Sequence, residues 1–475
     1  MRPLELTLFL LDIACLLLPL ATRPGSAAWR ALAWLAPLAG LTAVAQLVVE
    51  RYRWQMVPLY LLTVVLLALA LPRLLGRAPA DAPRRRARDW AAGVLGAVVL
   101  VVAGAPPVLF PVPVLPAPGG PYAIGTVTFQ WTDPSRPEIY TADPNDVRTI
   151  MVQIWYPATP APGAQPGPWM DRLDVAGPTI ARYLGLPSFF LDHAGLVKTN
   201  SYPNAALNPS QAPYPVVIYS HGWNGFRTVN LNQSEALASH GYIAVAVDHT
   251  YGAMLTVFSD GRVALNNPAA LPPETPADAY QAGIQALEAT YAADLRFVID
   301  QLALVNSGAI PSPLAGRLDL TRVGLYGHST GGGAVVLACN VDKRCKAGLG
   351  MDAWLEPVPQ AVLAQPLTQP FLFMRSQAWA TAENDARLAT LYEGAQAGVV
   401  RLTIVGTKHY DFVLLPLLTP LAPALGLKGP INGQRGMAII TNYLVAFFDH
   451  ALKGQDRPLL DGPSTSYPEV TFEHR

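Results

Sequence analysis

Four apolar segments near the start of this chain constrain its fold more than any other feature. They run over 4–21, 28–49, 57–71 and 90–109, and each is close to the roughly 20 residues that a helix needs to cross a bilayer. The turns between them are short and contain arginine. The sequence therefore predicts that residues 1–115 form an all-α bundle of about four transmembrane helices. Glu5 and Asp12, in the first segment, are costly in lipid unless they face the bundle or the interface.

Arginines are distributed unevenly among the connections of this bundle. The connection between the third and fourth segments carries Arg73, Arg77, Arg84, Arg85, Arg86 and Arg88. The second connection carries only Arg51 and Arg53, offset by Glu50. The positive-inside rule places the arginine-rich connection in the cytoplasm, together with the first connection and its Arg23 and Arg30. We therefore expect a multi-pass protein of the cell membrane, in contact with the lipid bilayer, whose chain after the fourth segment is extracytoplasmic.

The composition changes after the fourth segment. Residues 106–121 are rich in proline, which cannot continue a helix, and we interpret them as the helix exit and a semi-rigid stalk. We place a linker at 116–122 and a second domain at 123–475. The chain carries 33 basic and 33 acidic residues, so it lacks the basic excess that a nucleic acid partner requires. The oligomeric state stays open.

Strand-like and helix-like patterns alternate through the second domain. Apolar runs predict strands at 150–156, 214–219, 242–247, 323–326, 347–351, 370–374 and 399–405. Apolar residues spaced by three and four predict a helix over 284–305, and 437–452 is a closing helix with Gly454 placed to end it. Residues 170–202 are interpreted as an insertion that covers a pocket. This alternation predicts an α/β fold with a mostly parallel sheet covered on both faces.

The pentapeptide Gly327-His328-Ser329-Thr330-Gly331 lies where one of these strands turns into a helix. Such a turn, the nucleophile elbow, holds a serine in a strained conformation that exposes its hydroxyl. Glycines two residues either side are needed because side chains there would collide with the neighbouring strand and helix. The sequence therefore predicts Ser329 as a nucleophile and the whole domain as an α/β-hydrolase fold.

Serine needs a base and a third group that orients the base, and in this fold the chain order is serine, acid, histidine. The histidines that follow Ser329 are His409, His450 and His474. His450 lies on the closing helix and His474 at the terminus, whereas His409 comes just after a strand. We therefore predict His409 as the base by elimination.

Three aspartates compete for the role of the acid. Asp352 follows the strand after the elbow helix, where a carboxylate would project at the sheet edge that it shares with the serine. Asp342 lies on a polar turn and is expected to be solvated, and Asp411 is expected to point away from His409. We favour Asp352.

Two backbone amides are needed for the developing oxyanion. The residue after the nucleophile, Thr330, supplies one. The loop 220–226 follows an apolar strand and contains small residues, and we place the second donor at the amide of Trp223. His221 is interpreted as a scaffold residue of this loop.

These residues together resemble the secreted-type platelet-activating-factor acetylhydrolases of the α/β-hydrolase superfamily. The resemblance rests on five stretches, which are Ser220-His221-Gly222 with Gly225-Phe226-Arg227-Thr228, Gly327 to Gly332, Asp352-Ala353-Trp354, His409 with Asp411-Phe412, and Leu427-Lys428-Gly429. It covers roughly 121–456, and the order and spacing are more specific than the elbow alone.

The resemblance implies a calcium-independent serine esterase that removes short or oxidised acyl groups from phospholipids. It implies Ser329 as nucleophile, Asp352 as acid and His409 as base, with the amides of Trp223 and Thr330 as oxyanion hole, and no cofactor or metal. Thr330 stands where the family has a bulky apolar residue, and the membrane part is not in the family. These departures put the substrate in doubt more than the reaction.

Two further features have alternative interpretations. The apolar stretch 412–423 directly follows the predicted base. It has three alternative interpretations: it lines an acyl pocket, it presses against lipid, or it is buried core. Cys339 and Cys345 either form a disulfide in an oxidising compartment or are two separate core thiols. Cys15 is a small buried residue of an apolar segment.

The predicted function is that of a membrane-tethered serine ester hydrolase acting on a phospholipid or another ester. One alternative is a general small-ester or polyester hydrolase of the same fold. Another is a non-catalytic membrane receptor or transport component whose hydrolase-like domain only binds.

Overall fold

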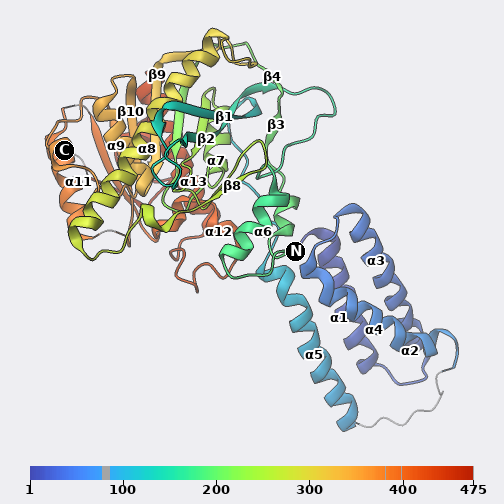
Figure 1. Cartoon of the computed structure of the whole chain (residues 1–475). Coiled ribbons are helices and arrows are strands. Elements are labelled where there is room, and N and C mark those ends of the chain that lie inside the picture. Colours follow the sequence, from blue (N-terminus) through green and yellow to red (C-terminus); the bar gives the residue numbers. More distant parts are fainter. Residues whose placement is uncertain (78–85, 380, 397, 474–475) are drawn as a thin grey trace. The chain divides into compact units, whose positions relative to one another are not determined.

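A computed structural model describes the chain except residues 78–85, 380, 397 and 474–475. Arg84, Arg85 and His474 thus lie outside the described residues. The chain divides into two compact units (Figure 1). The first comprises Met1–Pro113, Gly177–Val197 and Leu418–Leu421, and the second comprises Val114–Ala176, Lys198–Leu417 and Ala422–Arg475.

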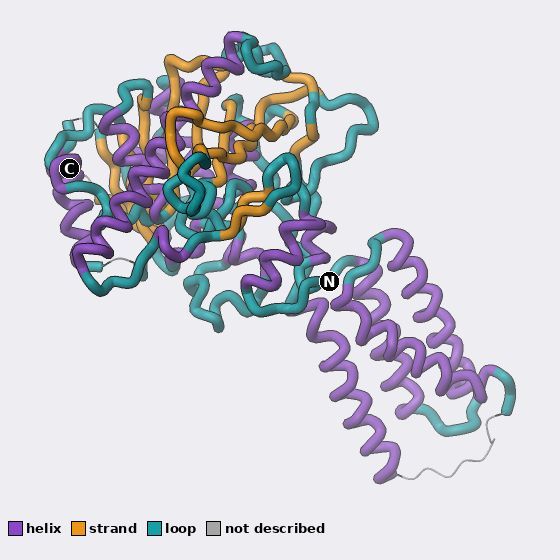
Figure 2. The backbone as a smooth tube through the Cα atoms, viewed as in Figure 1, coloured by secondary structure: helices purple, strands orange, loops and turns teal. Residues whose placement is uncertain are grey.

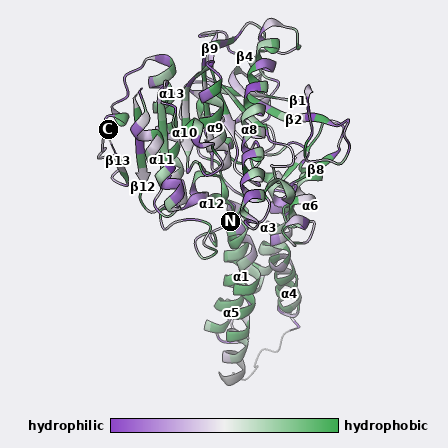
Figure 3. Ribbon diagram, turned by 60° about the vertical axis from the view of Figure 1, so that its left-hand side comes forward, coloured by the Kyte–Doolittle hydropathy of each residue, from purple (hydrophilic) through white to green (hydrophobic). Residues whose placement is uncertain are grey.

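The first unit is built from apolar helices. Its helices are α1 (Pro3–Ala21), α2 (Ala27–Ala31), α3 (Leu35–Val49), α4 (Val57–Leu74) and α5 (Arg86–Leu109). Among the described residues, four helical spans are long and apolar enough to cross a membrane: Pro3–Ala21, Ala27–Val49, Trp54–Leu74 and Trp90–Leu109. Green, hydrophobic ribbon predominates along them in Figure 3. The predicted four-helix bundle is therefore present, with the predicted segments.

The two acidic side chains of the first segment are paired with other polar groups inside this bundle. Glu5 is fully buried and accepts hydrogen bonds of 2.7 Å from both Nε and Nη2 of Arg53, which is itself 1% exposed. The same arginine donates to the backbone oxygen of Phe110 at 2.7 Å. Asp12 accepts from Thr63 Oγ1 at 3.0 Å. Both acidic residues of the first segment thus face the bundle interior, where the cost of a polar group in lipid is offset by its partners.

The second unit contains a large sheet between two layers of helices (Figure 2). In the described part of the chain this sheet has 11 strands, and ten of them follow the order β13-β12-β11-β10-β9-β5-β6-β2-β1-β3. The strands of the sheet are β1 (Ala123–Pro137), β2 (Val147–Thr159), β3 (Ser201–Pro203), β4 (Ala206–Leu207), β5 (Tyr214–Ser220), β6 (Ile243–Asp248), β9 (Leu318–His328), β10 (Cys345–Met351), β11 (Phe371–Ser376), β12 (Val399–Ile404) and β13 (Val470–Glu473). Two short strands, β7 (Leu255–Val257) and β8 (Val263–Leu265), form a separate hairpin.

The central six strands, from β12 to β6, are parallel. Strands β13, β2 and β1 extend the sheet in antiparallel pairing. Every residue of β5 and β6 is buried, because helices cover both faces of a parallel sheet and leave no face for polar side chains. The predicted mostly parallel α/β fold is confirmed.

Helices pack on both faces of this sheet. The main ones are α7 (Leu231–Ser239), α8 (Ala277–Ser307), α9 (Thr330–Val341) and α13 (Gly433–Lys453). The remaining α-helices of the chain are α6 (Leu173–Tyr183), α10 (Gln360–Leu363), α11 (Ala382–Gly394) and α12 (Leu415–Leu418). Val323 and Leu325 of β9 join one core cluster with α8 and α9. On the opposite face, a Cβ on Gly324 would lie 2.4 Å from the Phe448 ring of α13. Glycine thus allows the closing helix to approach β9 closely.

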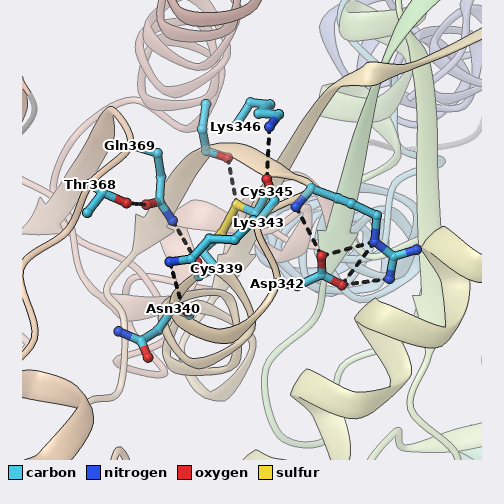
Figure 4. The surroundings of a disulfide bond; sticks show 10 residues. Cys339, Asn340, Asp342, Lys343, Cys345, Lys346, Thr368 and Gln369 are labelled. Carbon is cyan, nitrogen blue, oxygen red and sulfur yellow. Dashed lines mark hydrogen bonds and ion pairs between the residues drawn. A yellow bond between two sulfur atoms is a disulfide. The ribbon is translucent and has the colours of Figure 1, made fainter.

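A disulfide joins Cys339 near the end of α9 to Cys345 at the start of β10, with 5.1 Å between their Cα atoms (Figure 4). Between them, Asp342 is 8% exposed and forms an ion pair of 2.6 Å with Arg344. The structure therefore selects the disulfide alternative, and Asp342 is buried in an ion pair instead of being solvated.

Candidate active site

Ser329 lies between the end of β9 and the start of α9, with φ 55° and ψ −122°. This left-handed conformation is strained for a residue with a side chain, and its cost is of order 1–3 kcal/mol. The surrounding backbone holds it there: the Ser329 N–H donates to Met351 O at 3.0 Å, and Ser329 O accepts from the Trp354 N–H at 2.9 Å. The serine is therefore fixed at the carboxyl end of the parallel strands, between β9 and β10.

The glycines of the pentapeptide are needed for close backbone contacts. A Cβ on Gly327 would lie 2.2 Å from Gly331 O, and a Cβ on Gly331 would lie 2.1 Å from Ser220 O. Both distances are far inside van der Waals contact, so any side chain at either position would force the backbone apart. The turn from β9 into α9 can therefore form only with glycine at these two positions, as the sequence predicts.

Asp352 and His409 meet at the same edge of the sheet. Asp352 directly follows β10, and His409 opens the short 3-10 helix η5 (His409–Phe412) after β12. His409 Nδ1 donates to Asp352 Oδ2 at 3.1 Å. His328, the residue before Ser329, lies against His409, with its Nε2 3.0 Å from His409 O. No hydrogen bond joins Ser329 to His409 among the described residues, and such bonds are often long before substrate binds.

Burial sets the protonation of this pair. Loss of solvent lowers the pKa of the His409 imidazole, so the ring is neutral and its Nε2 is free to accept a proton at neutral pH. Burial raises the pKa of Asp352 to about 7, and hydrogen bonds from Ser376 oppose that rise. The pair is therefore in its ionised-acid, neutral-base form above about pH 7, and it takes up a proton as the pH falls.

The loop after β5 lies directly against Ser329. A Cβ on Gly222 would lie 3.0 Å from Ser329 Cβ, so the next residue, Trp223, is adjacent to the serine. Neither the Trp223 N–H nor the Thr330 N–H donates to an acceptor among the described residues. Two unpaired amides on either side of a serine can donate to an oxyanion that forms there.

The rival residues of the sequence analysis lie elsewhere. Asp411 is buried and accepts from the N–H groups of Lys408 at 2.8 Å and Gly429 at 2.7 Å, so its carboxylate fixes the backbone around η5 instead of contacting His409. Asp342 is at the far end of α9, beside the disulfide. His450 is on α13. His221 is fully buried in the loop after β5.

Two residues near Asp352 and His409 were not predicted from the sequence. Ser376, the last residue of β11, donates from its N–H to Asp352 Oδ1 at 2.7 Å and from its hydroxyl to Oδ2 at 2.6 Å. The Trp379 ring stacks on His409, with centroids 4.3 Å apart. The signal that could have found Ser376 is a serine at the carboxyl end of a strand next to the strand that carries Asp352. This signal is usable only when the order of the strands in the sheet is known. These residues fix the carboxylate and the imidazole in place.

Ser376→Ala is expected to move the acid limb of the pH–rate profile to higher pH. The hydroxyl stabilises the ionised form of Asp352, so its loss raises the pKa of that carboxyl further. With Asp352 as the predicted acid, activity requires its ionised form and is lost as the pH falls through its pKa. The midpoint of the acid limb is therefore expected to rise from about 7 by about one pH unit, which corresponds to one hydrogen bond to a charged group. Stopped-time assays of kcat/KM between pH 5 and 9 measure it, and an unmoved limb contradicts the role given to Ser376.

The elbow, the paired acid and base, and the open amides at the carboxyl edge of a parallel sheet define a class, the serine ester hydrolases of the α/β-hydrolase fold. The chain belongs, within that class, to the family described as platelet-activating factor acetylhydrolase, isoform II, whose model matches residues 111–272 and 294–459. The resemblance read from the sequence is therefore confirmed.

Individual proteins agree with this family. The chain is 25% identical to a platelet-activating factor acetylhydrolase of Canis lupus familiaris over 332 residues, covering 62% of this chain and 73% of the relative. It is 26% identical to a probable 1-alkyl-2-acetylglycerophosphocholine esterase of Arthroderma benhamiae over 400 residues, covering 75% and 93%. A solved ferulic acid esterase from Streptomyces cinnamoneus is 28% identical, with a TM-score of 0.63, covering 76% of this chain and 99% of that chain.

Proposed function

We propose that this chain is a membrane-tethered esterase that cleaves short or oxidised acyl groups from phospholipids through a Ser329-His409-Asp352 acyl-enzyme mechanism. The observation that carries the mechanism is the hydrogen bond of 3.1 Å between His409 Nδ1 and Asp352 Oδ2, formed at the sheet edge where Ser329 is held in its strained turn. The names of the relatives, acetylhydrolase and 1-alkyl-2-acetylglycerophosphocholine esterase, support the phospholipid substrate.

Acylation follows from this geometry. Ser329 Oγ bonds to the carbonyl carbon of the ester while His409 Nε2 takes the hydroxyl proton, and Asp352 stabilises the imidazolium. The carbonyl oxygen becomes an oxyanion that accepts hydrogen bonds from the Trp223 and Thr330 N–H groups. Collapse breaks the bond to the alcohol oxygen, which receives the proton from His409. A water molecule then repeats the sequence on the acyl-enzyme, giving the free acid and Ser329.

A second candidate is a hydrolase of small or aromatic esters, favoured by the likeness to the ferulic acid esterase. The two candidates differ in substrate and share the mechanism. A panel of 2-acetyl and long-chain phospholipids, p-nitrophenyl acetate and methyl ferulate separates them.

On this panel we expect kcat/KM to be highest for the 2-acetyl phospholipid and to fall by about 10²-fold or more when the acyl chain is long, because a pocket that fits a short acyl group excludes a long one. The Ser329→Ala enzyme, with every substrate, supplies the background rate. A kcat/KM for methyl ferulate that exceeds the value for the 2-acetyl phospholipid makes the second candidate the function.

We further propose that the four apolar helices span the cell membrane and that the second unit is extracytoplasmic. Arg73, in the last turn of α4, and Arg77, three residues after that helix, begin the arginine-rich connection that the positive-inside rule places in the cytoplasm. The disulfide between Cys339 and Cys345 supports an oxidising compartment for the second unit. The membrane spans would hold this esterase at the surface from which a phospholipid substrate comes.

Protease added to sealed cells is expected to digest the second unit and to leave the bundle protected. The readout is an immunoblot with one tag at residue 475 and another inserted in the connection between α4 and α5, with detergent-permeabilised cells as the control. Loss of the first tag with survival of the second is the expected pattern. Survival of the tag at residue 475 in sealed cells reverses the orientation.

A further inference from the structure

A second chain of serine, histidine and aspartate runs behind the candidate active site. Ser220 Oγ lies 2.9 Å from His249 Nε2, and His249 Nδ1 lies 3.0 Å from Asp294 Oδ2. Ser220, His249 and Asp294 are all at most 1% exposed. A substrate cannot reach an enclosed serine, so this chain is not a second active site, although its connectivity is that of a catalytic triad. Its position at the base of the loop after β5 suggests another use.

Asp294 fixes the orientation of His249. The carboxylate, on α8, is held by Arg148 at 2.6 Å and by Arg136 at 2.9 Å, so it is ionised and accepts the proton from His249 Nδ1. His249 Nε2 then accepts from the Ser220 hydroxyl. The Tyr291 ring stacks on the imidazole with centroids 3.7 Å apart. The backbone of His249 is thereby anchored on α8 and on the end of β5.

The anchored backbone in turn fixes His221. The His249 N–H donates to His221 Nε2 at 3.0 Å, so the proton of the His221 ring is on Nδ1, and this atom donates to Gly222 O at 2.7 Å. Burial lowers the pKa of both imidazoles, which keeps each ring neutral with one donor and one acceptor. Gly222 O also accepts from the Gly225 N–H at 2.8 Å.

Gly222 O belongs to the same peptide unit as the Trp223 N–H. In a trans peptide the C=O and the N–H point in opposite directions, so two hydrogen bonds on the oxygen also determine where the N–H points. They polarise the peptide as well, which makes its N–H a stronger donor. Gly222 lies against Ser329, so the N–H that results is adjacent to the candidate nucleophile.

We propose that His221 is a positioning residue for the reaction, and that His249 supports it: the two histidines orient the Gly222–Trp223 peptide so that its N–H stabilises the oxyanion. This inference rests on the proposed function, because it needs Trp223 as an oxyanion donor. It changes the interpretation of His221 from a passive scaffold residue to one that sets kcat. Ser220 and Asp294 complete the connection between α8, β5 and this loop.

Replacement of His221 by asparagine or by leucine tests the proposal with a matched pair. Both side chains have the same shape, but only the asparagine amide can occupy the place of Nδ1 and donate to Gly222 O. With p-nitrophenyl acetate, His221→Leu is expected to lower kcat by about 10²-fold, the loss seen when an oxyanion donor is removed, with KM changed less than about threefold. His221→Asn is expected to retain kcat within about tenfold of wild type. Inhibition by a trifluoromethyl ketone, which forms a tetrahedral adduct, is expected to weaken in parallel with kcat.

Equal kcat in the leucine variant and the wild type overturns the proposal, and so does an equal loss in both variants, because the donor would then be irrelevant. A rise in KM at constant kcat also overturns it. If His221→Leu does not fold, as judged by its thermal unfolding, His221→Phe keeps a ring in that place and loses the donor to Gly222 O. A kcat equal to wild type in that variant also overturns the proposal. Activity that survives Ser329→Ala is a failure of the proposed function instead, so the two failures are distinguishable.

Discussion

Ser329→Ala is expected to abolish both ester hydrolysis and labelling by a fluorophosphonate probe. In the proposed mechanism the Ser329 Oγ atom forms the covalent bond to the acyl group, and alanine lacks this atom. Loss of a serine nucleophile lowers kcat by about 10⁴-fold or more in enzymes of this mechanism. The turn itself is expected to persist, because backbone hydrogen bonds to Met351 and Trp354 hold it and alanine removes only the hydroxyl.

Ser307→Ala is the matched control for this variant. Ser307 is exposed at the end of α8, so its loss is expected to leave labelling and kcat unchanged. Equal labelling of wild type and Ser329→Ala shows that the nucleophile is another residue. Absence of both labelling and hydrolysis in the wild type, with intact binding of a phospholipid, supports the alternative of a membrane receptor or transport component.

The patterns that could be predicted from the sequence are local. Apolar length alone predicts the four helical spans to within about three residues at each end. Runs of apolar residues predict the central parallel strands, because a strand covered on both faces contains no polar alternation. The elbow is predictable because its glycines and serine are adjacent in the chain. The chain order expected for this fold then predicts that Asp352 and His409 lie at one edge of the sheet. In the structure a hydrogen bond connects the two side chains.

The parts that escaped prediction depend on long-range packing or break local rules. Strand β1 contains Asp133, Pro134 and Pro137, which are rare in strands, and it exists because β2 pairs with it. Helix α8 begins at Ala277, seven residues before the first apolar position of its predicted stripe. Ser376 meets Asp352 only because β11 lies beside β10. The link between His249 and Asp294 joins residues 45 apart in sequence, and no spacing rule anticipates it.

The apolar stretch 412–423 shows the same limit. Phe412, Val413 and Leu414 are buried within the second unit, whereas Leu418–Leu421 belongs to the first unit. There the Thr419 hydroxyl donates to Leu109 O at 2.7 Å. Composition treats this stretch as one apolar segment, but the structure divides it. Residues 412–414, the first part of the stretch, are buried core, which is one of the three alternatives given for the stretch in the sequence analysis.

Asp352→Asn is expected to lower kcat by about 10⁴-fold on every ester while leaving KM nearly unchanged. In the proposed mechanism the ionised carboxylate keeps the His409 proton on Nδ1, so that Nε2 can accept the proton of Ser329. An asparagine amide in the same place donates to Nδ1, which moves the imidazole proton to Nε2 and leaves no base facing the serine. Substrate binding uses other groups, so the loss is expected in the chemical step. Kinetics with acetyl and long-chain phospholipids and with p-nitrophenyl acetate measure both constants.

Asp342→Asn is the control, because this buried aspartate also follows the elbow but pairs with Arg344 beside the disulfide. It is expected to keep kcat within about threefold of wild type. We attribute the acid limb of the pH–rate profile near pH 7 to Asp352. This limb is expected to be absent from the pH–rate profile of the residual Asp352→Asn activity, since asparagine does not gain a proton in this range. An unchanged rate in Asp352→Asn removes this residue from the mechanism. A large loss in Asp342→Asn instead would place the acid at the opposite end of α9, where it cannot orient His409.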